Sequence, residues 1–154
     1  QFVIIGHSEN RENGENNDLI NLKIKSALEA KLKIIFCIGE TLTEKRNKKT
    51  QSVLSKQIQI GLNGIKNKSN IFIAYEPVWA IGTGIVPKSN DLLKTINFIK
   101  SKFKDKTPKV LYGGSVNPQN IIDLKKVNNI DGFLIGGASQ NAKKFIDIVK
   151  KTYS

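Results

Sequence analysis

Short apolar runs alternate along the chain with longer stretches in which apolar residues recur every three or four positions. The short runs are rich in β-branched residues and are apolar at successive positions, which is typical of parallel strands buried on both faces. We therefore expect five strands, at Phe2–Ile5, Ile34–Ile38, Ile71–Tyr75, Lys109–Tyr112 and Gly132–Ile135.

The longer stretches have the spacing of amphipathic helices, with one apolar face each. Residues that commonly start helices stand at Ser89-Asn90-Asp91 and at Asn117-Pro118. The predicted apolar faces are Ile20, Ile24, Ala27 and Leu28; Leu54, Ile58, Leu62 and Ile65; Leu92, Ile96, Ile99 and Phe103; and Ala142, Phe145 and Val149.

This alternation predicts an α/β fold with a parallel sheet and right-handed crossovers, in one domain over residues 1–154. Two architectures fit five β-α units. One is an open doubly wound sheet, and the other is an arc of a (β/α)8 barrel, whose complete form takes about 250 residues. Periodicity does not choose between them.

Composition narrows the class of protein. Hydrophobic residues make up 39% and charged residues 25%, as in globular proteins. No apolar run approaches the roughly 20 residues of a membrane-spanning helix, so we expect no membrane partner. The single cysteine, Cys37, fits a reducing compartment, and we expect a cytoplasmic protein.

The formal charge of +12 comes mostly from lysine. Nucleic acid is one candidate partner for such a surface, because phosphates attract it. The lysines are, however, spread over the helical segments and over Lys-Lys pairs. We interpret them as a solvated surface and expect no nucleic-acid partner.

Chemistry in parallel α/β folds gathers where strands end. The first strand is followed by His7, Ser8 and Glu9, and the third by Glu76. Glu76 leaves a buried strand, where an apolar neighbourhood would raise its pKa and make it a better base. The alternatives are that His7 is a structural histidine and that Glu76 is paired with a lysine or arginine. One histidine and one cysteine make a metal centre improbable, so we expect no metal site.

Glycine-rich loops follow the last two strands, at Gly113-Gly114-Ser115 and Gly136-Gly137. Glycine lets backbone N–H groups approach an anion, and N–H groups at a helix start carry partial positive charge. Adjacent last strands are a common place for a phosphate site in barrels. The alternative is that these glycines only make tight turns.

Five segments together resemble the triosephosphate isomerase family. They are VIIGHSENR (Val3–Arg11), CIGETLTEKR (Cys37–Arg46), AYEPVWAIGTG (Ala74–Gly84), YGGSVNPQN (Tyr112–Asn120) and DGFLIGGAS (Asp131–Ser139). They stand in family order with family-like separations. The resemblance implies a partial (β/α)8 TIM barrel, from about the family's fourth strand onward, with the first three β-α units missing.

The resemblance also implies roles. Glu76 would be the base that moves a proton between two carbons of a triose phosphate, and His7 the neutral electrophile. Ser8 and Glu9 would support the site. The substrate phosphate would lie against Gly82, Ser115, Gly136 and Gly137. The implied reaction interconverts dihydroxyacetone phosphate and D-glyceraldehyde 3-phosphate through an enediolate, in glycolysis and gluconeogenesis, without a cofactor. A homodimer is implied for the full-length protein.

The sequence departs from the family in places. Asn10 stands where a basic residue is usual, and Asn13 where an aromatic usually precedes the glycine. The family's substrate-binding lysine and its dimer-interlocking loop have no counterpart. We therefore expect the 154-residue chain alone to be inactive or nearly so. The alternative function is a non-catalytic module that binds phosphate or polyanions; another phosphate-binding barrel enzyme would leave His7 and Glu76 unexplained.

Overall fold

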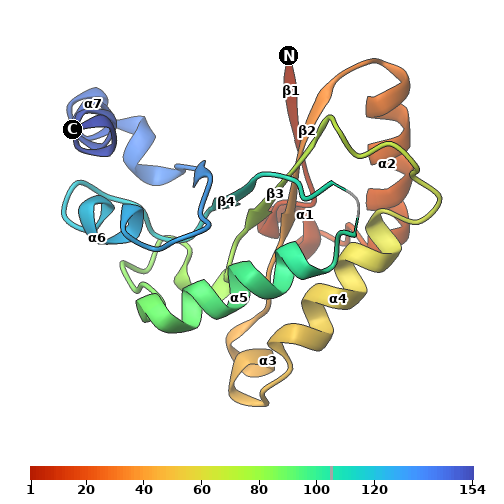
Figure 1. The fold of residues 1–154 in the computed structure, drawn as a ribbon, viewed down its shortest axis with the longest axis horizontal. Helices are drawn as coiled ribbons and strands as arrows, with labels where there is room; N and C mark the ends of the chain where they lie inside the picture. The colour runs from red at the N-terminus through yellow and green to blue at the C-terminus, as the bar shows by residue number, and fades with distance from the viewer. Residues whose placement is uncertain (105) are drawn as a thin grey trace.

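The five apolar runs form five parallel strands, which lie side by side in their order along the chain (Figure 1). The structure is a computed structural model that describes residues 1–104 and 106–154. In the register of the sheet, Ile4 lies opposite Ile35, and Ala74 lies opposite Leu111. The strands are β1 (Phe2–Ile5), β2 (Lys33–Ile38), β3 (Ile71–Tyr75), β4 (Val110–Tyr112) and β5 (Gly132–Phe133).

This strand order decides between the two architectures. A doubly wound sheet reverses its strand order at a switch point, whereas strands of a barrel follow one another around the ring. The observed order, β1-β2-β3-β4-β5, has no reversal. The α/β fold is confirmed as a partial barrel, and the carboxyl ends of all the strands meet at one edge.

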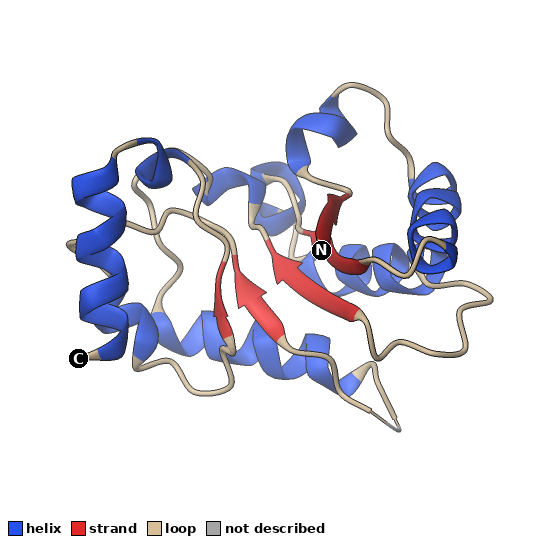
Figure 2. Ribbon diagram, turned by 90° about the horizontal axis from the view of Figure 1, so that it is seen from above, coloured by secondary structure: helices blue, strands red, loops and turns tan. Residues whose placement is uncertain are grey.

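Helices connect the strands and cover the outer side of the sheet (Figure 2). Helices α2, α4 and α5 pack on the strands, whereas α7 packs on α6 and on the short turn η2. Figure 1 shows α6 and α7 at one end of the molecule and α2 and α4 at the other. The helices are α1 (Ser8–Glu12), α2 (Asn17–Glu29), α3 (Leu42–Arg46), α4 (Thr50–Gly61), α5 (Ser89–Ser101), α6 (Ile121–Lys125) and α7 (Ala142–Tyr153), with 3₁₀ turns η1 (Val78–Ala80) and η2 (Gly137–Gln140).

The core lies between the sheet and these helices. Ile24, Leu54 and Ile96 are fully buried and come from α2, α4 and α5 in turn. Each such side chain contributes roughly 2–3 kcal/mol through the apolar surface that it removes from water. Helix α4 approaches β2 closely because Gly61 has no Cβ, which would otherwise lie 2.5 Å from the ring of Phe36.

The other, concave face of the sheet is apolar and open. Phe2 and Ile4 of β1 are 54% and 46% exposed. The ring of Phe2 packs edge-on against that of Phe72 on the same face, with centroids 5.2 Å apart. A closed barrel would bury these side chains in its interior.

Several predicted boundaries were wrong, those of the strands by one or two residues. Strand β2 starts at Lys33, β4 starts at Val110, and β5 ends at Phe133. Helices α4 and α5 end before Ile65 and Phe103, although both side chains still pack on the core. None of the helices in the described part of the chain combines the length and the apolar character that crossing a membrane requires.

The predicted apolar face of α7 is only partly buried. Phe145 and Val149 are each 39% exposed, whereas Ile148 is 1% exposed. The reason is the place of α7 at the β5 edge of the sheet, where no further β-α unit of the described chain covers its outer side.

Candidate active site

A cavity of about 400 Å³ opens at the carboxyl ends of the strands. Its lining includes six residues that the sequence singled out for chemistry. They come from four different strand-end loops, and only the fold brings them together. The six are His7, Glu76, Gly82, Ser115, Gly136 and Gly137.

His7 is oriented by the helix that it starts. Its Nδ1 accepts a hydrogen bond from the backbone N–H of Glu9 over 3.4 Å, at the N-terminus of α1. A neutral imidazole that accepts at Nδ1 carries its proton on Nε2. This Nε2 lies 3.5 Å from Oε1 of Glu76, so the proton-bearing nitrogen points into the cavity beside the carboxylate.

Glu76 continues directly from β3, and its backbone N–H donates to the carbonyl of Ile38 over 2.8 Å. The residue is 3% exposed. Burial raises the pKa of its carboxyl, while His7, the Cys37 thiol and a backbone hydrogen bond from Ser8 act in the opposite direction. A carboxylate with a raised pKa accepts a proton more readily than an ordinary glutamate.

Two glycines make room for Glu76. A Cβ on Gly113 would lie 2.8 Å from Cγ of Glu76, and a Cβ on Gly39 would collide with its backbone carbonyl. The sequence pointed to Gly113 only as part of a phosphate loop, and it did not single out Gly39 for this task. The available signal was that each glycine directly follows a strand.

The two residues predicted to support the site differ in their surroundings. Ser8 is 7% exposed, and its backbone contacts the Glu76 carboxylate. The Glu9 side chain is 82% exposed, with Oε2 4.0 Å from Nδ1 of His7. Glu9 therefore contacts His7 from the solvent side and does not line the cavity.

Ser115 holds the segment that follows Glu76. Its hydroxyl donates to the carbonyl of Ala80 over 2.6 Å and accepts from the N–H of Gly84 over 3.0 Å. Gly82 and Gly84 have φ values of +68° and +75°, which favour glycine. Ser115 thus links the loop from η1 to Gly84, which lines the cavity, to the loop that follows β4.

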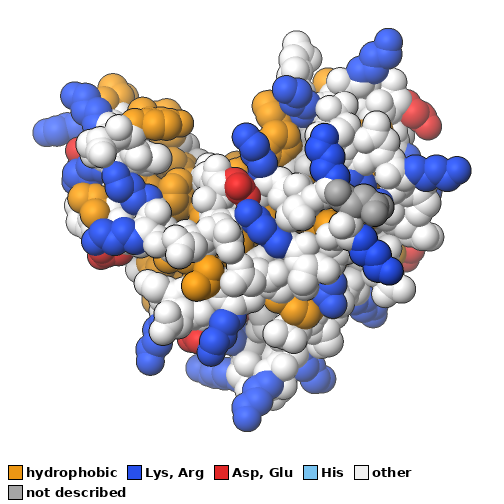
Figure 3. Space-filling model, viewed as in Figure 1, with side chains coloured by type: hydrophobic (Ala, Val, Ile, Leu, Met, Phe, Trp, Pro, Cys, Tyr) orange, Lys and Arg blue, Asp and Glu red, His pale blue; other side chains and the backbone are white. Residues whose placement is uncertain are grey.

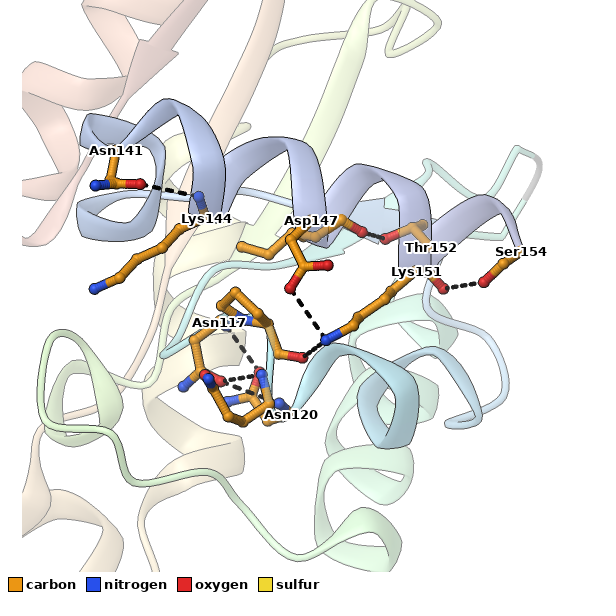
Figure 4. Close-up of polar contacts among 11 residues, drawn as sticks. Asn117, Asn120, Asn141, Lys144, Asp147, Lys151, Thr152 and Ser154 are labelled. Atoms are coloured by element: carbon orange, nitrogen blue, oxygen red, sulfur yellow. Dashed lines mark hydrogen bonds and ion pairs between the residues drawn. The ribbon is translucent and has the colours of Figure 1, made fainter.

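Gly136 and Gly137 stand at the start of η2 and face the same cavity. No hydrogen bond among the described residues uses their backbone N–H groups. Lys144 also lines the cavity. Asn141 caps α7, because its side-chain oxygen accepts a hydrogen bond from the backbone N–H of Lys144 over 3.0 Å (Figure 4). The side chain of Lys144 extends away from the helix in the same view. The sequence did not single out Lys144, although its place in the first turn of α7 was visible.

Buried polar contacts fix the start of the same loop. Glu40 is 1% exposed, and its carboxylate accepts from the indole N–H of Trp79 over 2.9 Å and from the hydroxyl of Tyr75 over 3.2 Å. The ammonium of Lys45 lies 3.3 Å from the centroid of the Trp79 ring. Trp79 is therefore held on both its edge and its face.

No group of three or more histidine, cysteine, aspartate or glutamate side chains that could hold a metal ion occurs within residues 1–104 and 106–154. The cavity thus presents a carboxylate, an imidazole and free backbone N–H groups. These can move a proton and hold an anion.

Comparisons with known proteins match this chain to one family. A family model described as triosephosphate isomerase matches residues 1–152. The triosephosphate isomerase of Thermodesulfovibrio yellowstonii is 45% identical, over 97% of this chain and 64% of the relative. That of Dictyoglomus turgidum is 46% identical over the same shares, and that of Pelodictyon phaeoclathratiforme is 47% identical over 96% of this chain and 62% of the relative.

The chain therefore spans less than two thirds of the length of these relatives. These coverage figures do not say which part of each relative the chain matches. The prediction that it matches the C-terminal part is therefore not borne out by them. The match of the family model over nearly all of the chain, together with the identities above, is sufficient for the assignment. The chain belongs to the triosephosphate isomerase family.

Proposed function

We propose that this chain carries the base, the electrophile and the phosphate loops of a triosephosphate isomerase. The whole protein would interconvert dihydroxyacetone phosphate and D-glyceraldehyde 3-phosphate, in glycolysis and gluconeogenesis in the cytoplasm. The observation that carries the proposal is the 3.5 Å approach of His7 Nε2 to Glu76 Oε1 in a cavity shared with the phosphate loops.

The chemistry follows from the two side chains. Glu76 removes a proton from C1 of dihydroxyacetone phosphate, while the Nε2–H of His7 donates a hydrogen bond to the carbonyl oxygen at C2. The electron pair of the broken C–H bond forms the enediolate, whose charge His7 stabilises. Glu76 returns the proton to C2, and the hydroxyl proton moves from O1 to O2. Atoms and charge balance without a metal or an organic cofactor.

The phosphate loops position the substrate and keep water out. The N–H groups of Gly136 and Gly137 would bind the phosphate oxygens, with Gly82 and Ser115 closing over them. Enclosure matters because an exposed enediolate would expel its phosphate. Lys144 adds a positive charge to this side of the cavity.

We further propose that the chain corresponds to the family fold from about its fourth strand onward. The five motifs in family order support this placement, as does the open concave face that three more β-α units would cover. A homodimer is proposed for the whole protein. The 154 residues alone should be inactive or nearly so, because the family's substrate-binding lysine has no counterpart in them.

A chimera tests the proposal. The first three β-α units of the Thermodesulfovibrio yellowstonii relative would be fused to residues 1–154, and isomerisation of D-glyceraldehyde 3-phosphate would be measured. We expect turnover by the chimera, little or none by the chain alone, and a loss of about 100-fold in kcat on His7→Gln. A folded chimera without turnover, or one indifferent to His7→Gln, would contradict the proposal.

A non-catalytic phosphate-binding module is the second candidate. The unused N–H groups of Gly136 and Gly137 beside Lys144 favour it. Phosphate would then stabilise the folded chimera against heat without any isomerisation.

A further inference from the structure

A second cavity lies at the opposite end of the sheet from the candidate active site. It has a volume of about 460 Å³ and is enclosed by the loops that follow α4 and α5 and lead into β3 and β4. Because these loops enter the strands at their amino ends, none of the residues placed in the candidate active site lines this cavity. Its lining includes five lysines: Lys66, Lys68, Lys102, Lys104 and Lys106.

These lysines are not matched by nearby carboxylates. None of the five forms an ion pair with a carboxylate within the described residues. The two loops contain one acidic residue, Asp105, which lies outside the described residues. In Figure 3, lysine and arginine side chains are spread over the visible face, including the region where these loops meet.

A purely structural role accounts for only part of this charge. Helices α4 and α5 end at the cavity, and the carboxyl end of each carries about half a negative charge. Lys68 is engaged within its own loop, since its ammonium donates to the carbonyl of Ile65 over 2.8 Å. The ammonium of Lys102 lies 4.3 Å from the centroid of the Phe98 ring. The two helix ends together contribute about one negative charge, and the aspartate in the loops contributes about one more. About three of the five lysine charges therefore remain unbalanced.

We propose that this cavity binds an oligophosphate anion. Several ammonium groups from two loops suit a ligand with negative charge distributed along a short chain, and the volume exceeds what a single phosphate fills. The cavity also has apolar lining from Ile58, Leu62 and Phe103, which can contact a nucleoside. The phosphate chain is common to two sources, inorganic oligophosphate and the tail of a nucleotide.

Calorimetric titration of the 154-residue chain with tripolyphosphate tests this site. We expect saturable binding that weakens by about 10-fold or more in the triple variant Lys66→Gln, Lys102→Gln, Lys104→Gln. A matched control, Lys49→Gln, Lys56→Gln, Lys94→Gln, removes the same charge elsewhere and should change affinity by less than about 2-fold. Circular dichroism checks folding, and the single change of the exposed Lys66 to Gln should still weaken binding if the triple variant does not fold.

A parallel titration with ATP and adenosine distinguishes the sources. Similar affinity for ATP and tripolyphosphate identifies the free phosphate chain, and tighter binding of ATP identifies a nucleotide; adenosine alone should not bind. The proposal is overturned if tripolyphosphate does not bind, or if both triple variants lose affinity equally. It is also overturned if Lys144→Gln in the candidate active site abolishes binding. Isomerase activity enters none of these readouts, so the outcome is independent of the proposed function.

Discussion

The carboxyl group of Glu76 is buried, and among the described residues it forms no ion pair with a lysine or arginine. Its carboxylate lies among the His7 imidazole, the Cys37 thiol and the Ser8 backbone, and the fixed cation Arg11 has a smaller influence on its pKa than each of these. Because desolvation is the largest influence, the pKa of Glu76 in the fold is above its ordinary value. A residue held in this way favours chemistry at a cost in stability.

This arrangement predicts a pH-dependent stability change for Glu76→Gln. The raised pKa means that ionisation of Glu76 destabilises the fold as the pH rises through that pKa, and that this cost is absent below the unfolded pKa. The variant should therefore be more stable at neutral pH by about 1–2 kcal/mol. The gain should fade as the pH falls to about 4. Urea unfolding across pH measures this.

Glu9→Gln is the matched control, because Glu9 is a carboxylate whose side chain is 82% exposed. It should leave the unfolding free energy unchanged at every pH. A Glu76→Gln variant that is less stable than the parent at neutral pH would show that the carboxylate is stabilised by its neighbours.

Arg11 joins three elements near the candidate active site. Its guanidinium donates to the carbonyl of Gly6 over 2.8 Å, to Oδ1 of Asn17 over 2.7 Å and to the carbonyl of Cys37 over 3.0 Å. These contacts tie the end of β1 to the start of α2 and to β2. Burial lowers the pKa of Arg11, while nearby carboxylates raise it.

Arg11→Lys should lower the free energy of unfolding by about 2–3 kcal/mol, because one ammonium cannot reproduce the fork of three hydrogen bonds. Denaturant unfolding measures the loss. The exposed Arg46 provides the control, since Arg46→Lys should stay within about 0.5 kcal/mol of the parent. Equal stability of the two variants would contradict the inference that the hydrogen bonds of Arg11 stabilise the contact between β1, β2 and α2.

The elements differ in how far the sequence could predict them. The strands were visible as short continuous apolar runs, and the four long helices because burial of one face imposes a period on several turns of sequence. Helices α1, α3 and α6 have five residues each, which is too short for a periodic signal. Ile65 and Phe103 misled the prediction of helix ends, because a side chain can stay in the core after its helix has ended.

The candidate site was predictable in part for the same reason. His7, Glu76 and the glycine loops could be found because each directly follows a strand, and parallel strands end at one edge. The contact of Gly39 and Gly113 with Glu76 could not be found, since it depends on which side chain lies across the sheet. The lysine cavity likewise needs two loops that only the fold brings together.

At the scale of the whole molecule, the sheet is an arc with an exposed apolar face. Phe2 and Ile4 of β1 are about half exposed on this face. Apolar surface of this kind, together with two open sheet edges, favours association. The 154-residue chain should therefore form oligomers as its concentration rises.

Light scattering coupled to size-exclusion chromatography measures this association. Phe2→Glu should shift the chain toward monomer at a given concentration, because it places a charge on the apolar face. The control Leu22→Glu changes an exposed leucine of α2, outside this face, and should leave the association unchanged. A parent chain that stays monomeric at high concentration would contradict the prediction.

We propose that Glu76 is the base of an isomerase of which this chain is one part. The most direct measurement is the kcat of the chimera for D-glyceraldehyde 3-phosphate with Glu76→Asp. Shortening the side chain withdraws the carboxylate by roughly one carbon–carbon bond, so kcat should fall by about 100-fold or more with substrate affinity little changed. An unchanged kcat would show that Glu76 is not the base.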